Sequence, residues 1–154
     1  MNPSRAPTDV EAYLRRHIPI SASMEVRVRK CSMDGVVLEA PLDANVNHRA
    51  TVFGGSASAV AILSAWTWLH WALLDEALKC RVVIQRNQMD YELPIEADFT
   101  AHCEGMPEAD WDKMIRTLKR HGKARVSLSA WLEQGGQKVA QFSGDYVAVI
   151  LPES

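Results

Sequence analysis

The strongest constraint in this sequence is a run of 25 residues, from position 50 to position 74, that contains no Asp, Glu, Lys or Arg. An apolar helix of that length can span a bilayer. However, the first half of the run is largely Gly, Ser and Ala, which gain little from transfer into lipid. His70 also lies inside it, and no basic cluster flanks it. We therefore expect a helix that begins at Gly54 and Gly55, continues to about Lys79, and is buried on all sides by its own protein.

Length and composition predict one globular domain. The chain has 154 residues, of which 47% are hydrophobic and 23% charged, as in ordinary soluble proteins. A formal net charge of -2 argues against a nucleic acid partner. Three widely spaced cysteines without a CxxC pair argue against a disulfide framework or a thiolate metal site, and favour a reducing compartment. The N-terminal residues lack an apolar signal segment, so we expect a cytoplasmic protein without a membrane partner.

The segments around the central helix predict an antiparallel sheet. Apolar and polar residues alternate in several of them, and glycine-containing turns separate them. Thr8 and Glu11 form a capping-box pattern, and Asp110 and Gly122 fit the two ends of a later helix. The expected strands cover residues 24–29, 36–40, 80–91, 96–104, 124–133 and 138–149, and the expected outer helices cover residues 8–17 and 111–121. This order predicts one α+β domain over residues 1–154, with residues 1–20 as an N-terminal helical extension.

The beginning of the central helix is its most informative part. Gly54, Gly55 and Ser56 start a run of small residues, whereas the second half of the helix is rich in Trp and Leu. A helix N-terminus carries unpaired amide N–H groups and a partial positive charge, and glycine lets a ligand approach them closely. The alternative is that the glycines only allow tight packing. The P-loop pattern and the GxSxG pattern of serine hydrolases are both missing.

A set of ordered motifs resembles the hotdog-fold thioesterases, and most closely the thioesterase domain at the C-terminus of YiiD-like proteins. The resemblance covers about residues 23–149. It is carried by Ala40-Pro41-Leu42, by Asn47-His48-Arg49-Ala50-Thr51-Val52-Phe53-Gly54-Gly55-Ser56, by the Trp-containing helix, by Tyr91-Glu92-Leu93-Pro94 and by Gly144-Asp145-Tyr146-Val147.

This resemblance implies a hotdog fold, in which a curved antiparallel sheet wraps around one long helix, and a homodimer or higher homo-oligomer. It implies substrates that are acyl thioesters of coenzyme A or of acyl carrier protein. No separate cofactor or metal is implied, because coenzyme A or phosphopantetheine is part of the substrate. By similarity, the amide N–H of Gly55 or Gly54 would stabilise the oxyanion, and Asn47 would hold water or the carbonyl group.

The sequence departs from the resemblance where a general base is expected. Many related enzymes have His where Phe53 stands and a carboxylate where Ile62 stands, and this helix contains no Asp or Glu before Asp75. Ser56 and Ser64 are candidates to orient water, although a hydroxyl is a poor base at neutral pH.

Two further polar residues are candidates from a partner subunit. Asn87 and Asp90 lie on the strand over residues 80–91, and together with Phe53 and Gly54 they complete the candidate substrate-binding set. The alternative for these polar residues is a solvated or interface-facing strand.

Two functions from different classes remain open on the sequence. The first is a thioesterase, and the second is a module that binds acyl thioesters or docks an acyl carrier protein without cleaving its cargo. The missing helix carboxylate favours the second. The histidines lack the spacing of a metal site, and the adjacent His102 and Cys103 should point to opposite faces of their strand.

Overall fold

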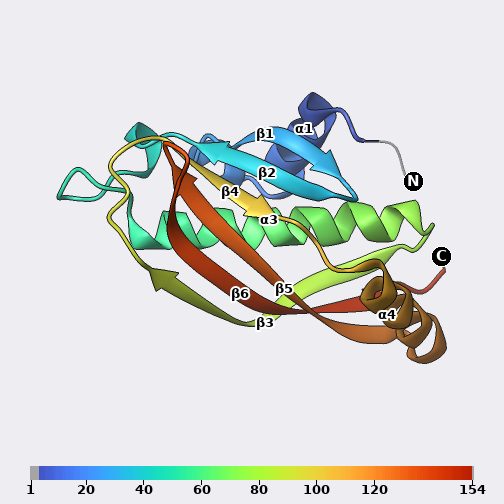
Figure 1. The fold of residues 1–154 in the computed structure, drawn as a ribbon. Helices are drawn as coiled ribbons and strands as arrows, with labels where there is room; N and C mark the ends of the chain where they lie inside the picture. The colour runs from blue at the N-terminus through green and yellow to red at the C-terminus, as the bar shows by residue number, and fades with distance from the viewer. Residues whose placement is uncertain (1–3, 154) are drawn as a thin grey trace.

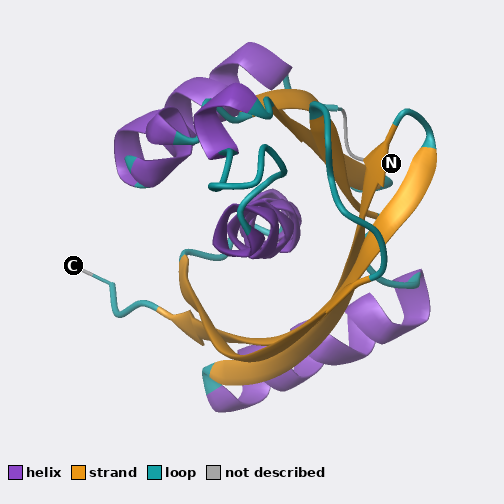
Figure 2. Cartoon of the chain, turned by 90° about the vertical axis from the view of Figure 1, so that its left-hand side faces the viewer, coloured by secondary structure: helices purple, strands orange, loops and turns teal. Residues whose placement is uncertain are grey.

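The protein, described here from a computed structural model that covers residues 4–153, is built around one central helix. Six antiparallel strands, in the order β1-β2-β4-β5-β6-β3, form a single sheet that curls around this helix (Figures 1 and 2). The elements are α1 (Pro7–His17), α2 (Ile20–Ser23), β1 (Arg27–Ser32), β2 (Gly35–Ala40), the 3-10 turn η1 (Asp43–Asn45), α3 (Gly54–Asp75), β3 (Cys80–Tyr91), β4 (Phe99–Cys103), α4 (Glu108–His121), β5 (Lys123–Gln134) and β6 (Gln137–Ile150). The expected α+β architecture of a curved sheet around one helix is confirmed.

Helix α3 is the centre of the hydrophobic core. Its sequence is apolar nearly all round, and its Trp68 and Leu69 side chains are buried. It is long and apolar enough to cross a membrane, but 67% of its most apolar window is buried inside the fold, as expected for a core helix. The helix ends at Asp75 rather than near Lys79, because Ala77 takes a positive φ of 57° and the chain turns away there.

The strands follow the predicted pattern, with differences at their ends. β3 has the predicted bounds, and the β5–β6 hairpin turns at Gly135 and Gly136, whose φ angles of 57° and 78° require this residue type. β1 begins at Arg27 and not at residue 24, because Glu25 has a φ of 54° and breaks the extended chain. β4 begins only at Phe99, three residues later than predicted.

The expected capping box on α1 is wrong. Ala6 occupies the N-cap position without a side-chain hydrogen bond, and the Glu11 carboxylate instead accepts a 3.0 Å bond from the backbone N–H of Val28. This contact ties α1 to β1. The later helix also starts before its predicted cap, at Glu108 after Pro107, but it ends at the predicted Gly122, whose φ is 77°.

Candidate functional site

The N-terminus of α3 presents three backbone amides without a hydrogen-bond acceptor among the described residues. Phe53 is the N-cap, its own N–H donates to the Asn45 carbonyl at 2.7 Å, and its carbonyl accepts from Ala57 at 3.1 Å. No side chain caps the helix, which leaves the N–H groups of Gly54, Gly55 and Ser56 without partners. Three free donors and the positive end of the helix dipole suit an oxyanion.

Two aromatic rings flank these amides. Gly55 is exposed, and a Cβ atom added there would lie 2.4 Å from the ring of Phe53. The hydroxyl of Tyr91, at the end of β3, donates a 2.9 Å hydrogen bond to the Gly54 carbonyl. The glycine at position 55 therefore lets Phe53 fold over the helix start, and Tyr91 ties the helix start to the sheet.

This end of the molecule also exposes several large apolar side chains. Four large side chains are 43–57% exposed there, namely Val46, Phe53, Tyr91 and Leu93. A cavity of about 290 Å³ lies beside them, lined by Thr51, Val52, Ala57, Tyr91, Glu92, Leu93, Pro94 and Ile95. Apolar surface around a few convergent polar groups is typical of small-molecule sites.

Asn47 lies in the loop before α3, and its side chain makes its hydrogen bonds within that loop. Its Oδ1 accepts from the N–H groups of Arg49 at 2.8 Å and Thr51 at 3.2 Å, and its Nδ2 donates to the Thr51 hydroxyl at 2.8 Å. The loop it shapes extends beyond the start of α3 in Figure 1. The Asn47 side chain therefore fixes the loop that leads into α3.

Sequence reasoning missed two residues that build the site. Asn45 is 3% exposed, and its Nδ2 donates to the carbonyls of Met24 at 3.0 Å and Pro41 at 2.8 Å. Nothing in the spacing of the two asparagines indicates that the first is buried. Tyr91 belongs to the motif that carries the resemblance, but its bond to Gly54 joins positions far apart in the chain.

The two serines lie in different surroundings. Ser56 is half-buried in the first turn of α3 and belongs to the group of free amides. Ser64 is fully buried, and its hydroxyl donates to the Ala61 carbonyl at 2.8 Å. This geometry gives Ser64 no access to water or ligand, so we remove it from the candidate set. Ile62 is half-buried, and no carboxylate stands on the helix before Asp75.

Asn87 and Asp90 lie on opposite faces of β3. Asn87 pairs in register with the buried Gly144, which places it on the concave side that holds α3. Asp90 pairs with Gln141 on the convex side, and its carboxylate accepts only a long, 3.5 Å bond from Gln88. Of these two residues, only Asn87 shares the side of the sheet on which α3 lies.

The buried cysteines are poorly suited to nucleophilic chemistry. Burial raises the pKa of the Cys31 and Cys103 thiols to about 11, which makes both poor nucleophiles at neutral pH. His102 and Cys103 point to opposite faces, as expected, because His102 stacks on Trp131 outside the sheet while Cys103 is buried. Among residues 4–153, no group of three or more His, Cys, Asp or Glu side chains is arranged to hold a metal ion.

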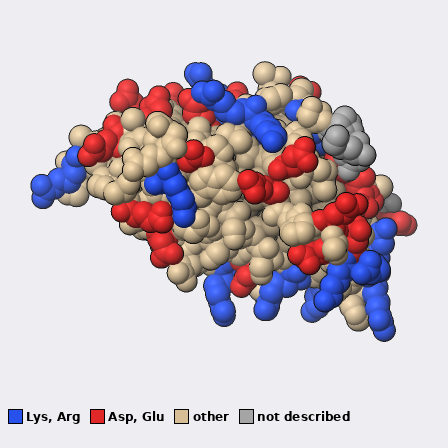
Figure 3. Space-filling view, in the orientation of Figure 1, with Lys and Arg blue, Asp and Glu red and all other residues tan. Residues whose placement is uncertain are grey.

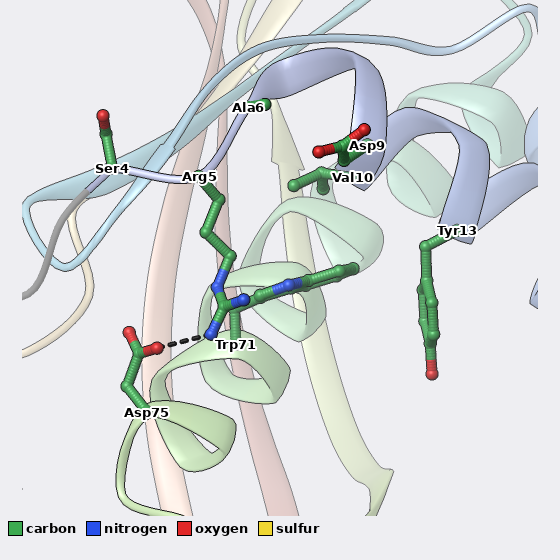
Figure 4. A pocket seen from close by; sticks show the side chains of 8 residues that line it. All are labelled: Ser4, Arg5, Ala6, Asp9, Val10, Tyr13, Trp71 and Asp75. Carbon is green, nitrogen blue, oxygen red and sulfur yellow. Dashed lines mark hydrogen bonds and ion pairs between the residues drawn. The ribbon is translucent and has the colours of Figure 1, made fainter.

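A second cavity, of about 370 Å³, lies at the opposite end of α3 (Figure 4). There the Arg5 guanidinium is paired with the Asp75 carboxylate, and the ring of Trp71 lies beside it. At about 1.5 Å per helical residue, Asp75 is about 30 Å from Gly54. This cavity is therefore separate from the amides at the helix start.

Comparisons with known proteins agree with this fold. The profile of the family described as "Putative thioesterase (yiiD_Cterm)" matches residues 7–150. A solved structure of a protein of unknown function from Chlorobaculum tepidum TLS is 26% identical, with 94% of each chain covered and a TM-score of 0.87.

Two further structures show the same fold. A "putative thioesterase" from Shewanella oneidensis is 24% identical, with 93% of this chain and 96% of that chain covered and a TM-score of 0.83. A "probable thioesterase" from Pseudomonas aeruginosa is 18% identical, with 95% and 97% covered and a TM-score of 0.79. The chain has the hotdog fold and belongs to the family described as "Putative thioesterase (yiiD_Cterm)".

Proposed function

We propose that this protein hydrolyses the thioester bond of an acyl-coenzyme A or an acyl carrier protein. The observation that carries the proposal is the uncapped start of α3, where the amides of Gly54, Gly55 and Ser56 have no acceptor among the described residues. A thioester carbonyl oxygen seated there would accept hydrogen bonds from groups that are already oriented. The apolar side chains around the amides suit an acyl chain.

The reaction needs little beyond these donors and a water molecule. Water attacks the carbonyl carbon, and the oxygen of the tetrahedral intermediate carries the negative charge that the amides stabilise. The carbon–sulfur bond then breaks, the proton of the attacking water passes to the leaving thiolate, and a carboxylic acid and a free thiol result. Each aligned donor lowers the barrier by about 3 kcal/mol.

Among the residues that line the cavity beside the helix start, Glu92 is the only carboxylate, and it is paired with Lys138 at 3.4 Å. Ser56 offers a hydroxyl in the first turn of α3, and Asn47 fixes the loop leading into that turn. Neither group is a base at neutral pH. We therefore expect a slow enzyme in which ordered water and the oxyanion-stabilising amides supply most of the rate enhancement.

A second candidate function follows from the absence of a general base on α3. α3 has no carboxylate between Gly54 and Asp75, so the helix offers amides to bind a thioester carbonyl but no carboxylate to activate water. A module that binds acyl thioesters, or docks an acyl carrier protein without hydrolysis, needs only the first. The two functions differ in whether free thiol is released.

The site supports a homodimer. The cavity beside the helix start, of about 290 Å³, is small for an acyl chain attached to pantetheine. The apolar side chains next to it remain exposed in one protomer. A second copy that covers this surface would complete the site.

The deciding experiment measures free thiol release from a panel of acyl-coenzyme A thioesters of different chain lengths. Turnover that falls in Ser56→Ala, but not in the matched Ser58→Ala two positions along the same helix, would support hydrolysis at this site. Saturable binding without thiol release would support the binding module. Absence of both binding and release across the panel and with an acylated carrier protein would reject both functions.

A further inference from the structure

Glu92 brings a carboxylate to the cavity beside the start of α3. It is the only acidic residue among those that line this cavity, whose volume is about 290 Å³. Apart from the hydroxyls of Thr51 and Tyr91, the remaining lining side chains are apolar. One of them, Ala57, belongs to the first turn of α3. The Glu92 carboxylate therefore shares a cavity with the turn that presents the free amides.

The backbone holds Glu92 in place directly after β3. The N–H groups of Glu92 and Leu93 both donate to the Val139 carbonyl, at 2.9 and 3.1 Å. The preceding residue, Tyr91, donates its hydroxyl to the Gly54 carbonyl at 2.9 Å. Figure 3 shows acidic and basic side chains close together over this end of β3, which lies at the left of Figure 1. Glu92 is thus one residue away from direct contact with the helix start, on a segment fixed at both points.

The ion pair of Glu92 leaves one of its carboxylate oxygens free. Lys138 Nζ donates to Oε2 at 3.4 Å, whereas Oε1 accepts no hydrogen bond from any residue between positions 4 and 153. The Glu92 and Lys138 side chains are 42% and 45% exposed, so water reaches the carboxylate. A carboxylate oxygen that accepts a hydrogen bond from water is the arrangement that general base catalysis requires.

A hydroxyl group in the same cavity is suited to hold that water. Thr51 Oγ1 accepts a 2.8 Å hydrogen bond from Asn47 Nδ2, and the hydroxyl hydrogen of Thr51 has no acceptor among the described residues. This hydrogen is available for donation to a water oxygen. A water molecule that accepts from Thr51 and donates to Glu92 keeps a lone pair for attack on a carbonyl carbon.

We propose that Glu92 is the general base of the hydrolysis, an inference that rests on the proposed function. Its Oε1 takes a proton from the water as the water oxygen bonds to the thioester carbonyl carbon, and the amide of Gly54 or Gly55 binds the oxyanion. The carbon–sulfur bond then breaks with its electron pair on sulfur, and Glu92 gives the proton to the leaving thiolate. The products are a carboxylic acid and a free thiol, and the carboxylate is restored.

The competing role for Glu92 is purely structural. In that role its ion pair with Lys138, on β6, only ties the chain after β3 to the neighbouring strand. An exposed ion pair contributes little to stability, so its loss should disturb the site only slightly. The two roles therefore predict different results when the carboxylate is removed and when only the ion pair is removed.

Thiol release from an acyl-coenzyme A separates the two roles. Glu92→Gln keeps the size of the side chain and should lower kcat by about 100-fold with little change in KM, because a general base acts on the chemical step. Lys138→Met removes the ion pair but keeps the carboxylate, and should lower kcat far less. Glu96→Gln, an exposed glutamate outside the cavity, should match the wild type. Thr51→Val should also lower kcat, whereas Thr51→Ser, which keeps the hydroxyl, should not.

Hydroxylamine gives a readout that a structural role would not produce. It attacks the carbonyl carbon through a neutral nitrogen that does not first have to lose a proton, and it yields a hydroxamate instead of the acid. Glu92→Gln should therefore keep most of the hydroxamate formation above the uncatalysed background while it loses hydrolysis. Circular dichroism of each variant checks that the fold is intact.

Three results would overturn the role of Glu92: wild-type thiol release in Glu92→Gln, an equal loss of hydrolysis and hydroxamate formation in that variant, or an equally large loss in Lys138→Met. In each of these cases the wild-type protein still hydrolyses the thioester, so the proposed function stands and only the base is rejected. A wild-type protein that forms neither free thiol nor hydroxamate from any thioester of the panel would reject the proposed function and the base together.

Discussion

The phenol of Tyr91 donates a 2.9 Å hydrogen bond to the carbonyl oxygen of Gly54, which joins the last residue of β3 to the first residue of α3. Tyr91 also lines the cavity beside the helix start. The bond therefore holds the free amides at a fixed position relative to the sheet edge. The geometry of the proposed site depends on this connection.

Replacing Tyr91 with Phe tests this connection. The variant keeps the ring and removes only the hydroxyl, so we expect a loss of unfolding free energy of about 1 kcal/mol or less, because the pair is exposed to solvent. We expect the affinity for an acyl-coenzyme A, measured by isothermal titration calorimetry, to fall by a larger fraction than the unfolding free energy does. Tyr13→Phe, at the other end of α3, is the control. Equal affinities for the wild type and Tyr91→Phe would contradict the positioning role.

Gly55 and Gly54 should respond differently to alanine. A Cβ atom at position 55 would lie 2.4 Å from the Phe53 ring, whereas one at position 54 would lie 3.6 Å from the Tyr91 ring, an ordinary contact. Because Phe53 is 57% exposed, its ring can move aside, so Gly55→Ala should change stability by only about 1 kcal/mol. The displaced ring should weaken acyl-thioester binding in Gly55→Ala but not in Gly54→Ala. Calorimetric affinities that are equal in both variants would be inconsistent with this reading.

Substitutions of the two asparagines before the helix should affect stability and thiol release to different extents. Asn45→Ala removes a buried amide that donates to two carbonyls, and should cost about 1–3 kcal/mol in urea unfolding. Asn47→Ala loosens an exposed loop, so we expect a smaller stability loss and a clear loss of thiol release. Unchanged release in Asn47→Ala would show that the loop does not shape the site, even if the fold is intact.

The lowered pKa of His70 predicts that the protein loses stability in mild acid. Burial, with smaller contributions from the charges of Arg5 and His17, lowers the pKa of His70 from 6.5 to about 4, and its ring stacks between Trp66 and Tyr13. The folded protein therefore keeps His70 neutral while the unfolded chain takes up a proton below pH 6.5. The stability that neutral His70 contributes is full above that pH and is lost as pH falls toward 4.

Urea unfolding at pH 7 and pH 5 measures this effect. We expect His70→Gln to reduce the acid-induced loss of unfolding free energy by about 1 kcal/mol, because the partial exposure of the ring screens part of the shift. His121→Gln, at an exposed histidine, should reproduce the wild-type dependence. An unchanged pH dependence in His70→Gln would show that another group is responsible.

Periodicity and turn residues predicted most of the fold. The uncharged run identified α3, and the bounds of β3 and the β5–β6 turn follow from alternation and from two glycines with positive φ. The errors occur where a distant contact decides the local structure. Glu11 matches a capping pattern, but its carboxylate bonds to Val28 on a neighbouring strand.

The site was predicted less completely, for the same reason. Gly54 and Gly55 were chosen as candidates because glycine exposes the amides of a helix start, and the same two residues are also compatible with tight packing. The burial of Ser64 depends on the rotation of α3 within the sheet, which spacing alone does not determine. The faces of Asn87 and Asp90 depend on the register shift between Ile84 and Arg86, a bulge that alternation does not reveal.

The most direct measurement is a crystal structure with a non-hydrolysable acyl-coenzyme A analogue, in which a methylene group replaces sulfur. We predict that its carbonyl oxygen lies within hydrogen-bonding distance of the backbone nitrogen of Gly54 or Gly55. An analogue bound with its carbonyl group away from the start of α3 would contradict the central claim.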